Sequence, residues 1–265
     1  MKKLLLLTVS ALVVLGCNTK SSSSQGDDEK ETRELKTEVF KYENKMPHCE
    51  AFISIEFPVD GDEELGDSIY DFIVATMTEQ QVYEDELDDY RNDGQGFVDF
   101  FGKYISKDLQ EGLETYPIDE TSEEELVENV KYSVVENNDK YVTYLYEYDS
   151  YYGGDGFAHR VGATFLKDDC KRVTNEFLFK DPSSQKLITL ICNTLIDKYC
   201  KGSDAFLEES ELESIDSLPQ LSFYLTAEGL GFFYDMYEVH WMLLEGVIPW
   251  EKVKSLLTDE AKELI

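Results

Sequence analysis

The sequence predicts an α+β fold in which antiparallel sheets pack with helices in a two-part arrangement. Several short segments alternate apolar with polar residues, which is the period of a half-buried strand. Longer segments repeat their apolar residues at helical spacing. Predicted strands and helices come in clusters rather than in strict alternation, and this order favours antiparallel sheets over a parallel sheet with crossover helices.

The first half of the chain is predicted to contain two strands followed by two helices. The strands are residues 38–42 and 50–57; Ile53 and Ile55 share one face of the second strand, and Pro58 is expected to end it. The helices are residues 64–79 and 97–113, each with an apolar stripe. The second stripe is rich in aromatic residues, which we assign to a core rather than to a cofactor site.

The second half is predicted to contain two hairpins, two further strands and two helices. The hairpins are residues 131–148, turning at 137–140, and residues 222–234, turning at 227–229. Residues 163–166 and 176–179 are the further strands. Residues 183–199 form an amphipathic helix with Ser183 as its N-cap, and residues 250–257 form a short closing helix.

The N-terminal segment is typical of a bacterial secretory signal. A basic start precedes an apolar run over residues 4–15, which is shorter than the about 20 residues needed to span a bilayer. The run Val14-Leu15-Gly16-Cys17 resembles a lipobox, the cleavage site of bacterial lipoproteins. This resemblance implies that Cys17 becomes the first mature residue and carries acyl chains that anchor the protein to a membrane. The alternative is an ordinary secretory signal with an incidental cysteine.

Four parts are expected along the chain. They are a lipoprotein signal peptide over residues 1–17, a flexible acidic and serine-rich tether over 18–33, an N-terminal subdomain over 34–128 and a C-terminal domain over 129–260. The expected location is the cell envelope. Asn18 is not the aspartate that retains some lipoproteins in the inner membrane, which favours the outer membrane and leaves its periplasmic or surface face undecided.

The charge of the chain restricts its partners. The formal net charge is −32, from 56 acidic and 24 basic residues. Phosphate contacts require Lys and Arg, so no nucleic-acid partner is expected. An acidic surface suits a cationic protein or a metal ion and speeds encounter with basic proteins, or it serves solubility alone.

The cysteines predict neither a zinc site nor a single disulfide pattern. Besides Cys17 the chain has Cys49, Cys170, Cys192 and Cys200. Cys192 and Cys200 fall on one predicted helix about 12 Å apart, which is too far for a disulfide. A Cys49–Cys170 bridge and free buried thiols both remain open, and no cluster of Cys and His predicts structural zinc.

Calcium binding is not predicted by any complete motif. Residues 89–94 superficially resemble a calcium loop, but Arg91 would occupy the third position, where an oxygen ligand is required. Incidental calcium binding elsewhere stays open, and no cofactor is expected.

A segment rich in tyrosine and glycine, residues 141–157, is the candidate ligand-binding surface. Tyrosine offers a large apolar face with a polar tip, and glycine permits close approach of a partner. The alternative is that alternate tyrosines cover a sheet and the glycines make its turn. The candidate binding residues are Tyr148, Tyr151, Tyr152, Gly153, Gly154 and Asp155.

Several stretches of the second half resemble a known domain. These are residues 141–154, 175–180, 225–238 and the run Ile248-Pro249-Trp250-Glu251. In order and spacing they resemble the extracellular domain of unknown function at the C-terminus of the lysozyme-sensing anti-sigma factor RsiV, which also accompanies peptidoglycan deacetylases of the PdaC type. The first half is similar to the small domain that usually precedes it. The resemblance implies an α+β fold and a binding or sensing role, with no catalytic residues to carry over.

The chain departs from that family in three respects. Members often continue the paired glycines with Ala-His, whereas Gly153-Gly154 is followed here by Asp155-Gly156. The chain also has neither an anti-sigma segment with its membrane helix nor a deacetylase unit with its paired histidines. Transcription control and deacetylation by this chain are therefore disfavoured.

The expected function is that of a non-enzymatic envelope lipoprotein with a ligand-binding or sensing ectodomain. The resemblance suggests a cationic protein such as lysozyme, or peptidoglycan-related glycan, and the acidic charge favours the protein. One alternative is a hydrolase of envelope polysaccharide that uses His159 and Asp155, although no nucleophile motif accompanies them. Another alternative is a structural envelope subunit.

Overall fold

The computed structural model describes residues 34–78, 87–115, 118, 125–152, 155–199, 210, 212, 214, 218–219 and 221–265. The predicted signal peptide with Cys17, the tether, Gly153, Gly154 and Cys200 lie outside the described residues. Residues Thr32–Ile265 form one compact unit. The predicted boundary between residues 128 and 129 falls inside it and stays a prediction. In the described part of the chain, no helix is both long enough and apolar enough to cross a membrane.

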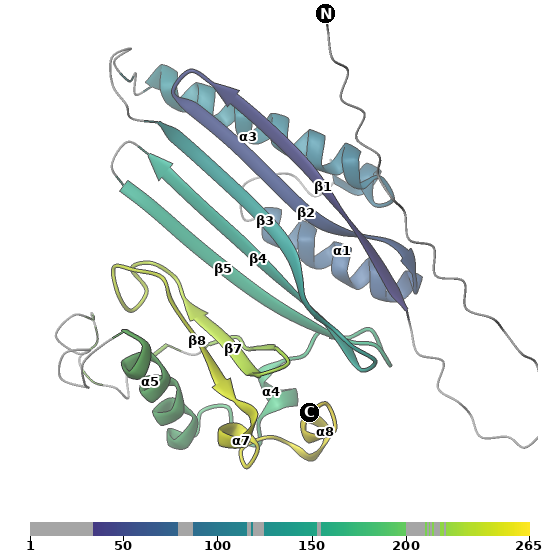
Figure 1. Ribbon diagram of the computed structural model, residues 1–265, viewed down its shortest axis with the longest axis vertical. Helices are drawn as coiled ribbons and strands as arrows, with labels where there is room; N and C mark the ends of the chain where they lie inside the picture. The colour runs from purple at the N-terminus through teal and green to yellow at the C-terminus, as the bar shows by residue number, and fades with distance from the viewer. Residues whose placement is uncertain are drawn as a thin grey trace, which may run out of the picture. The chain divides into compact units, whose positions relative to one another are not determined.

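A five-stranded sheet is the largest element of the fold (Figure 1). Its strands, in spatial order, are β1 (Leu35–Met46), β2 (Cys49–Gly61), β3 (Leu126–Asn137), β4 (Tyr141–Tyr152) and β5 (Asp155–Leu166). All neighbours are antiparallel except β2 and β3, which are parallel, with Cys49 opposite Leu126. The helical segment between β2 and β3 returns the chain to the end of the sheet where β2 began, so β3 must run in the same direction. The predicted α+β class with antiparallel sheets is therefore confirmed, with one parallel pair added.

The strands are longer than their sequence pattern predicted. Pro58 does not end β2, which continues to Gly61. Proline is tolerated there because the pairing of β2 with β3 stops at Ile55, so beyond that point β2 needs no hydrogen bonds on that side. The isolated prediction of residues 163–166 likewise describes only the last third of β5.

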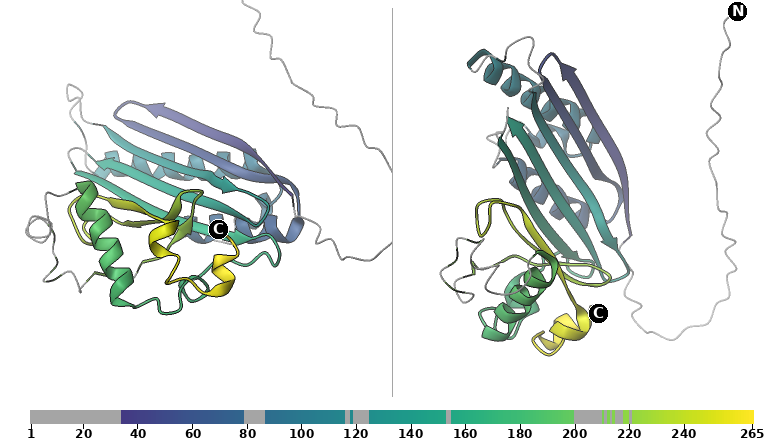
Figure 2. Two further views of the ribbon diagram at one scale, coloured as in Figure 1. Left: turned by 60° about the horizontal axis from the view of Figure 1, so that its bottom comes forward. Right: turned by 60° about the vertical axis from the view of Figure 1, so that its left-hand side comes forward.

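Two helices cover one face of this sheet. They are α1 (Glu63–Thr78) and α3 (Gly94–Thr115), with the short helix η1 (Asp88–Tyr90) before α3. Figure 2 shows both long helices on the same side of the strands. Alternate residues of β2, including Ile53 and Ile55, are fully buried against them, as are Tyr144 and Tyr146 of β4. We call the opposite side of the sheet the open face.

A second, smaller layer follows along the chain. It contains the sheet β6 (Tyr224–Leu225), β7 (Gly229–Tyr234) and β8 (Leu244–Pro249), with helices α4 (Asn175–Leu178), α5 (Gln185–Tyr199), α7 (Trp250–Val253) and α8 (Asp259–Lys262). These elements enclose a core of their own. Figures 1 and 2 show this layer beside β5.

Three local predictions in this layer are wrong. Residues 176–179 are predicted as a strand, but residues 176–178 belong to the single helical turn α4, because the Thr174 side chain accepts a hydrogen bond from the Phe177 amide and caps a helix. Only Phe179 is extended, and it forms an isolated bridge with Leu257. Ser183 does not cap α5; its hydroxyl donates to Asp181 Oδ1 at 2.9 Å and α5 begins at Gln185. The closing helix α7 ends at Val253, four residues earlier than predicted.

The two layers meet through a tyrosine placed between glycines. A side chain added at Gly162 of β5 would lie 2.5 Å from the Tyr224 ring, and one at Gly231 of β7 would lie 2.2 Å from it. The Tyr224 ring stacks on Phe233 with a centroid separation of 5.2 Å. The next amide, that of Leu225, donates to Thr164 Oγ1 of β5 at 2.9 Å. Tyr224 therefore packs where only glycine leaves enough room.

The cysteine alternatives are resolved for the described residues. Cys49 is a free thiol with 2% of its surface exposed, so the Cys49–Cys170 bridge is not formed. Burial raises the pKa of the Cys49 thiol. Cys170 is also buried and lies 3.6 Å from Asp62 Oδ1.

Replacing Gly162 with alanine should lower the free energy of unfolding by about 1–3 kcal/mol, because the new methyl group would displace the Tyr224 ring. Gly156→Ala is the matched control on the same strand, since its added carbon would meet nothing closer than 3.7 Å. Urea unfolding followed by circular dichroism measures both variants. If the two variants are equally stable, the packing of Tyr224 does not require glycine at position 162.

Candidate functional site

The predicted tyrosine surface lies at the end of β4. Tyr151 and Tyr152 are the last two residues of the strand, and each is 42% exposed. Because successive side chains of a strand point to opposite faces, Tyr151 belongs to the open face and Tyr152 to the helix-covered face. Tyr148 is 7% exposed and its ring lies against that of Phe157. The Asp155 side chain lies outside the described part, with Gly153 and Gly154.

Tyr152 contacts a buried carboxyl group. Its hydroxyl donates to Glu128 of β3, which is only 5% exposed and lies on the helix-covered face. Burial raises the pKa of the Glu128 carboxyl and the negative charge of Asp108 adds to the shift, whereas hydrogen bonds from Tyr152 and Tyr148 oppose it. Burial also raises the pKa of Tyr148 to about 12. Tyr152 therefore makes a hydrogen bond inside the sheet and also has a partly exposed ring.

His159 has a structural partner in the smaller layer. Its Nδ1 atom hydrogen-bonds Asp235 Oδ2, and the other carboxylate oxygen of Asp235 accepts the Arg160 amide at 3.0 Å. The Nε2 atom of His159 is buried, and its ring lies edge-on to Tyr146. The hydrolase alternative paired His159 with Asp155; the carboxylate that His159 contacts is Asp235, and the buried nitrogen is not accessible to a substrate from solvent.

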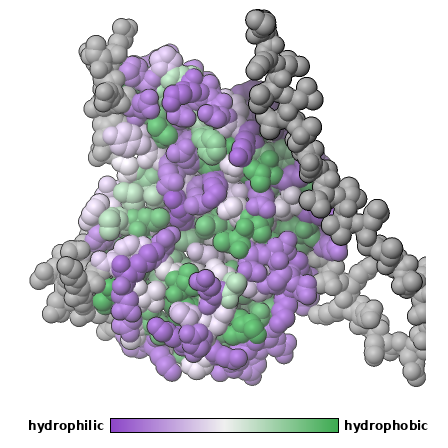
Figure 3. Space-filling view, viewed as in Figure 1, coloured by the Kyte–Doolittle hydropathy of each residue, from purple (hydrophilic) through white to green (hydrophobic). Residues whose placement is uncertain are grey.

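The open face next to Tyr151 carries paired charges. Glu147 and Asp149 alternate with Tyr151 along β4 and so share its face. Lys131 contacts Glu147 at 2.6 Å, and Arg160 contacts Asp149 at 2.7 Å. In Figure 3, which looks onto the open face, polar and apolar side chains are mixed rather than gathered in one large apolar area.

Other exposed aromatic residues were not predicted as binding residues. Phe157 on β5 is 41% exposed, and Tyr237 and Trp241, in the segment between β7 and β8, are 59% and 63% exposed. The available sequence signal was the aromatic content of residues 237–241, which lacks the alternation of a strand. The aromatic content does not indicate which of these side chains are exposed.

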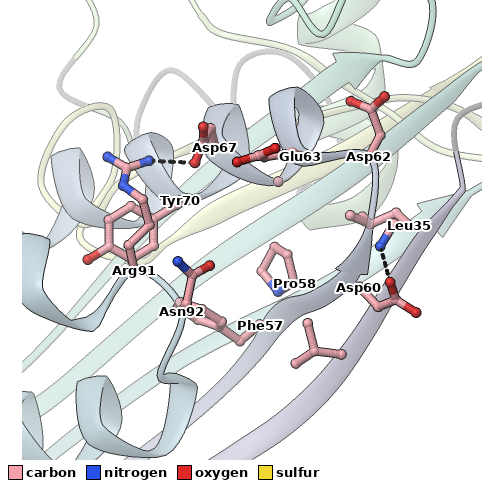
Figure 4. Close-up of a pocket in the computed structure, with 13 residues that line it drawn as sticks. Leu35, Phe57, Pro58, Asp60, Asp62, Glu63, Asp67, Tyr70, Arg91 and Asn92 are labelled. Atoms are coloured by element: carbon pink, nitrogen blue, oxygen red, sulfur yellow. Dashed lines mark hydrogen bonds and ion pairs between the residues drawn. The ribbon is translucent and has the colours of Figure 1, made fainter.

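An acidic pocket lies at the C-terminal end of strand β2 (Figure 4). Its volume is ≈ 330 Å³, and it is formed by the end of β2, the start of α1 and the turn before α3. Apolar and aromatic residues contribute to its wall, and the carboxylates at its rim are Asp60, Asp62, Glu63 and Asp67.

Arg91 is the basic residue of this pocket. It donates to Asp67 Oδ1 and Asp71 Oδ1, each at 2.9 Å, and its guanidinium lies 4.4 Å from the centre of the Tyr70 ring. Figure 4 shows Arg91 beside Tyr70 with its bond to Asp67. Asp60 is also paired, with Lys36 Nζ at 2.5 Å, and the Asp62 carboxylate accepts the Leu65 amide at 2.9 Å. Among the residues that the structure describes, no group of three or more His, Cys, Asp or Glu side chains could hold a metal ion.

Comparison with known proteins shows the fold alone. No family model and no curated protein matches the sequence. A solved structure of a DUF3298 family member from Bacteroides fragilis covers 86% of this chain and 96% of its own, with a TM-score of 0.66 and 17% identity. A DUF3298 family protein from Pseudomonas aeruginosa covers 87% of this chain and 97% of its own, with a TM-score of 0.54 and 15% identity. The fold is thus that of a bacterial domain of unknown function, and the narrower RsiV and PdaC-type resemblance stays a prediction.

Glu128 should make the protein less stable as pH rises. Its carboxyl has a raised pKa in the folded state, so between the unfolded and folded pKa values the native protein holds more protons than the unfolded chain, and stability falls with pH. Glu128→Gln imitates the neutral form. The unfolding free energy of the variant minus that of the wild type should therefore increase between pH 4 and pH 7, measured by urea unfolding. A pH-independent difference would show that the Glu128 carboxyl titrates normally.

Proposed function

We propose that this chain is a non-enzymatic, lipid-anchored ectodomain of the cell envelope that binds a cationic protein. The predicted signal with Cys17 supports the anchor, and the RsiV-type resemblance supports the binding role. The outer membrane is the proposed location. Within this proposal, no residue carries out catalysis and the folded unit supplies the binding surface.

The observation that carries the proposal is the end of β4. There Tyr151 exposes its ring on the open face, next to the carboxylates of Asp149 and Glu147 on the same face. Tyrosine is enriched in protein interfaces because its ring buries a large area at a small cost in conformational entropy. Lys131 and Arg160 pair with these two carboxylates, so the charge that would attract a basic partner is the acidic excess of the whole chain.

The charge of the whole chain strengthens this reading. A net charge of −32 attracts a cationic protein over a distance and raises its association rate, an effect that salt screens within about 8 Å at physiological ionic strength. Lysozyme is the basic protein suggested by the resemblance. Peptidoglycan-related glycan is the second candidate ligand, because an exposed tyrosine ring can also stack on a sugar.

Titration of the purified protein with lysozyme should show binding that weakens as salt increases. Tyr151→Ala should reduce the affinity about tenfold, a loss of about 1.4 kcal/mol, with little change in the unfolding midpoint because the ring is partly exposed. Tyr151→Phe keeps the ring and is the matched control. Tyr152 is a poorer choice, since its hydroxyl contacts the buried Glu128.

Two further arms locate the binding surface. Glu63→Gln alters the acidic pocket and should leave lysozyme affinity unchanged if the end of β4 is the contact. Soluble peptidoglycan fragments replace lysozyme in the second arm. If the titration with lysozyme at low ionic strength gives heats of dilution and no binding signal, the proposal is refuted. If the peptidoglycan fragments bind saturably and lysozyme does not, the glycan is the favoured ligand.

A further inference from the structure

The segment between β7 and β8, residues 235–243, is a loop closed by its own hydrogen bonds. The Tyr237 amide donates to the His240 carbonyl at 2.7 Å, and the Asp235 amide donates to Glu238 Oε2 at 3.1 Å. The Met242 amide donates to His240 Nδ1 at 3.1 Å. Val239 and His240 are buried at 0% and 3% exposure and anchor the loop from within. We call this segment the 235–243 loop.

The loop is also fastened to the outer strand of the large sheet. Asp235 accepts hydrogen bonds from the Arg160 amide and from His159, both on β5. The next residue, Met236, donates its amide to the Ala158 carbonyl at 3.5 Å. Hydrogen bonds within the loop and hydrogen bonds to β5 therefore both hold the loop in place. This gives the loop a defined conformation before any partner binds.

This fixed loop exposes large aromatic side chains. Trp241 is 63% exposed and Tyr237 is 59% exposed, the two highest values among the exposed large hydrophobic residues described. Phe157 is 41% exposed and adjoins Ala158, to which the loop is bonded. Exposed Trp and Tyr on a fixed backbone are the residues that most often anchor a protein partner.

The backbone at Tyr237 supports a binding role. Its φ is 66°, in the left-handed region that a bulky side chain rarely adopts and that glycine adopts freely. Such a conformation persists only where the surrounding bonds enforce it, and it is frequent at ligand-binding sites. The loop thus keeps an exposed ring at a position where glycine would fit the backbone better.

The charge of the loop indicates what it binds. Residues 235–243 contain no lysine or arginine. The Asp235 carboxylate is bound to β5, and the second acidic residue, Glu238, is exposed beside Tyr237. An aromatic face with a neighbouring carboxylate attracts a guanidinium or ammonium group, by the cation–π interaction and by charge. A basic side chain on a protein surface satisfies both features at once.

We propose that the 235–243 loop is a docking element for arginine or lysine side chains of the cationic protein partner, with Trp241 and Tyr237 as its aromatic anchors. This inference rests on the proposed function and extends its binding surface from the end of β4 to the smaller layer.

Two substitutions separate binding from structure. Trp241→Ala removes the more exposed ring and should weaken lysozyme binding about tenfold. Tyr237→Gly removes the other ring and also relieves the positive φ, so it should raise the unfolding midpoint while it weakens binding by a similar factor. Val39→Ala, which shortens a 54% exposed side chain on β1, is the control and should change neither quantity. A raised midpoint with unchanged affinity would overturn the docking role.

Tryptophan fluorescence reports on the loop directly. The chain has two tryptophans, and Trp250 donates its Nε1 hydrogen to the Thr226 carbonyl at 3.2 Å. Trp250→Phe leaves Trp241 as the reporter. A deca-arginine peptide, which contains no aromatic residue, should protect Trp241 from quenching by acrylamide, and added salt should reverse this protection.

The outcomes distinguish the two proposals. No binding of either lysozyme or deca-arginine to the wild-type protein would overturn both the proposed function and the loop assignment. Wild-type binding that survives Trp241→Ala and Tyr237→Gly unchanged would overturn the loop assignment alone. Protection of Trp241 by peptidoglycan fragments but not by deca-arginine would also overturn it, in favour of a sugar ligand.

Discussion

The position of the smaller layer against the large sheet depends on the hydrogen bonds that the Asp235 carboxylate makes with strand β5. Strand β5 is the outer strand of the large sheet, and such an edge exposes backbone groups that need partners. Asp235 binds the Arg160 amide and the His159 ring at this edge, and Met236 binds the Ala158 carbonyl. Together with the packing of Tyr224 against Gly162, these bonds join the smaller layer to the larger one. The same hydrogen bonds fix the position of the 235–243 loop.

The large sheet also separates the acidic pocket from the tyrosine surface. Cys49, at the start of β2, lies opposite Leu126, which in turn pairs with Tyr152, so the tyrosines lie at this end of the sheet. The acidic pocket includes the residues at the other end of β2. A 13-residue strand extends roughly 40 Å. The pocket and the tyrosine surface are therefore independent sites, and charge around one does not explain binding at the other once salt screens it.

The sequence predicted the elements whose pattern is set by burial on one side. The helices at residues 64–79 and 97–113 are confirmed as α1 and α3, because their apolar stripes face the large sheet. Prediction failed where a single contact decides the structure. Residues 176–179 have the composition of a strand, but the Thr174 cap makes residues 176–178 helical and leaves only Phe179 extended. Pro58 remains inside β2 because the pairing with β3 has already ended, which depends on a strand far along the chain.

The candidate site shows the same limit. The sequence identified the tyrosines of β4, and alternation alone would place Tyr148 and Tyr151 on opposite faces. Which face α1 and α3 cover depends on the register of the whole sheet, so the burial of Tyr148 was beyond a local pattern. The partner of His159 lies 76 positions away. Trp241 belongs to a short irregular segment, where no period distinguishes an exposed ring from a buried one.

Hydrogen–deuterium exchange of the wild-type protein and Asp235→Ala tests the central claim most directly. Loss of the carboxylate should increase exchange at the Arg160 amide and throughout the 235–243 loop, while the amides of Ile53 and Ile55 between the large sheet and its helices keep their protection. Unchanged protection at Arg160 and in the loop would contradict the account, because the edge of β5 would then be closed without Asp235.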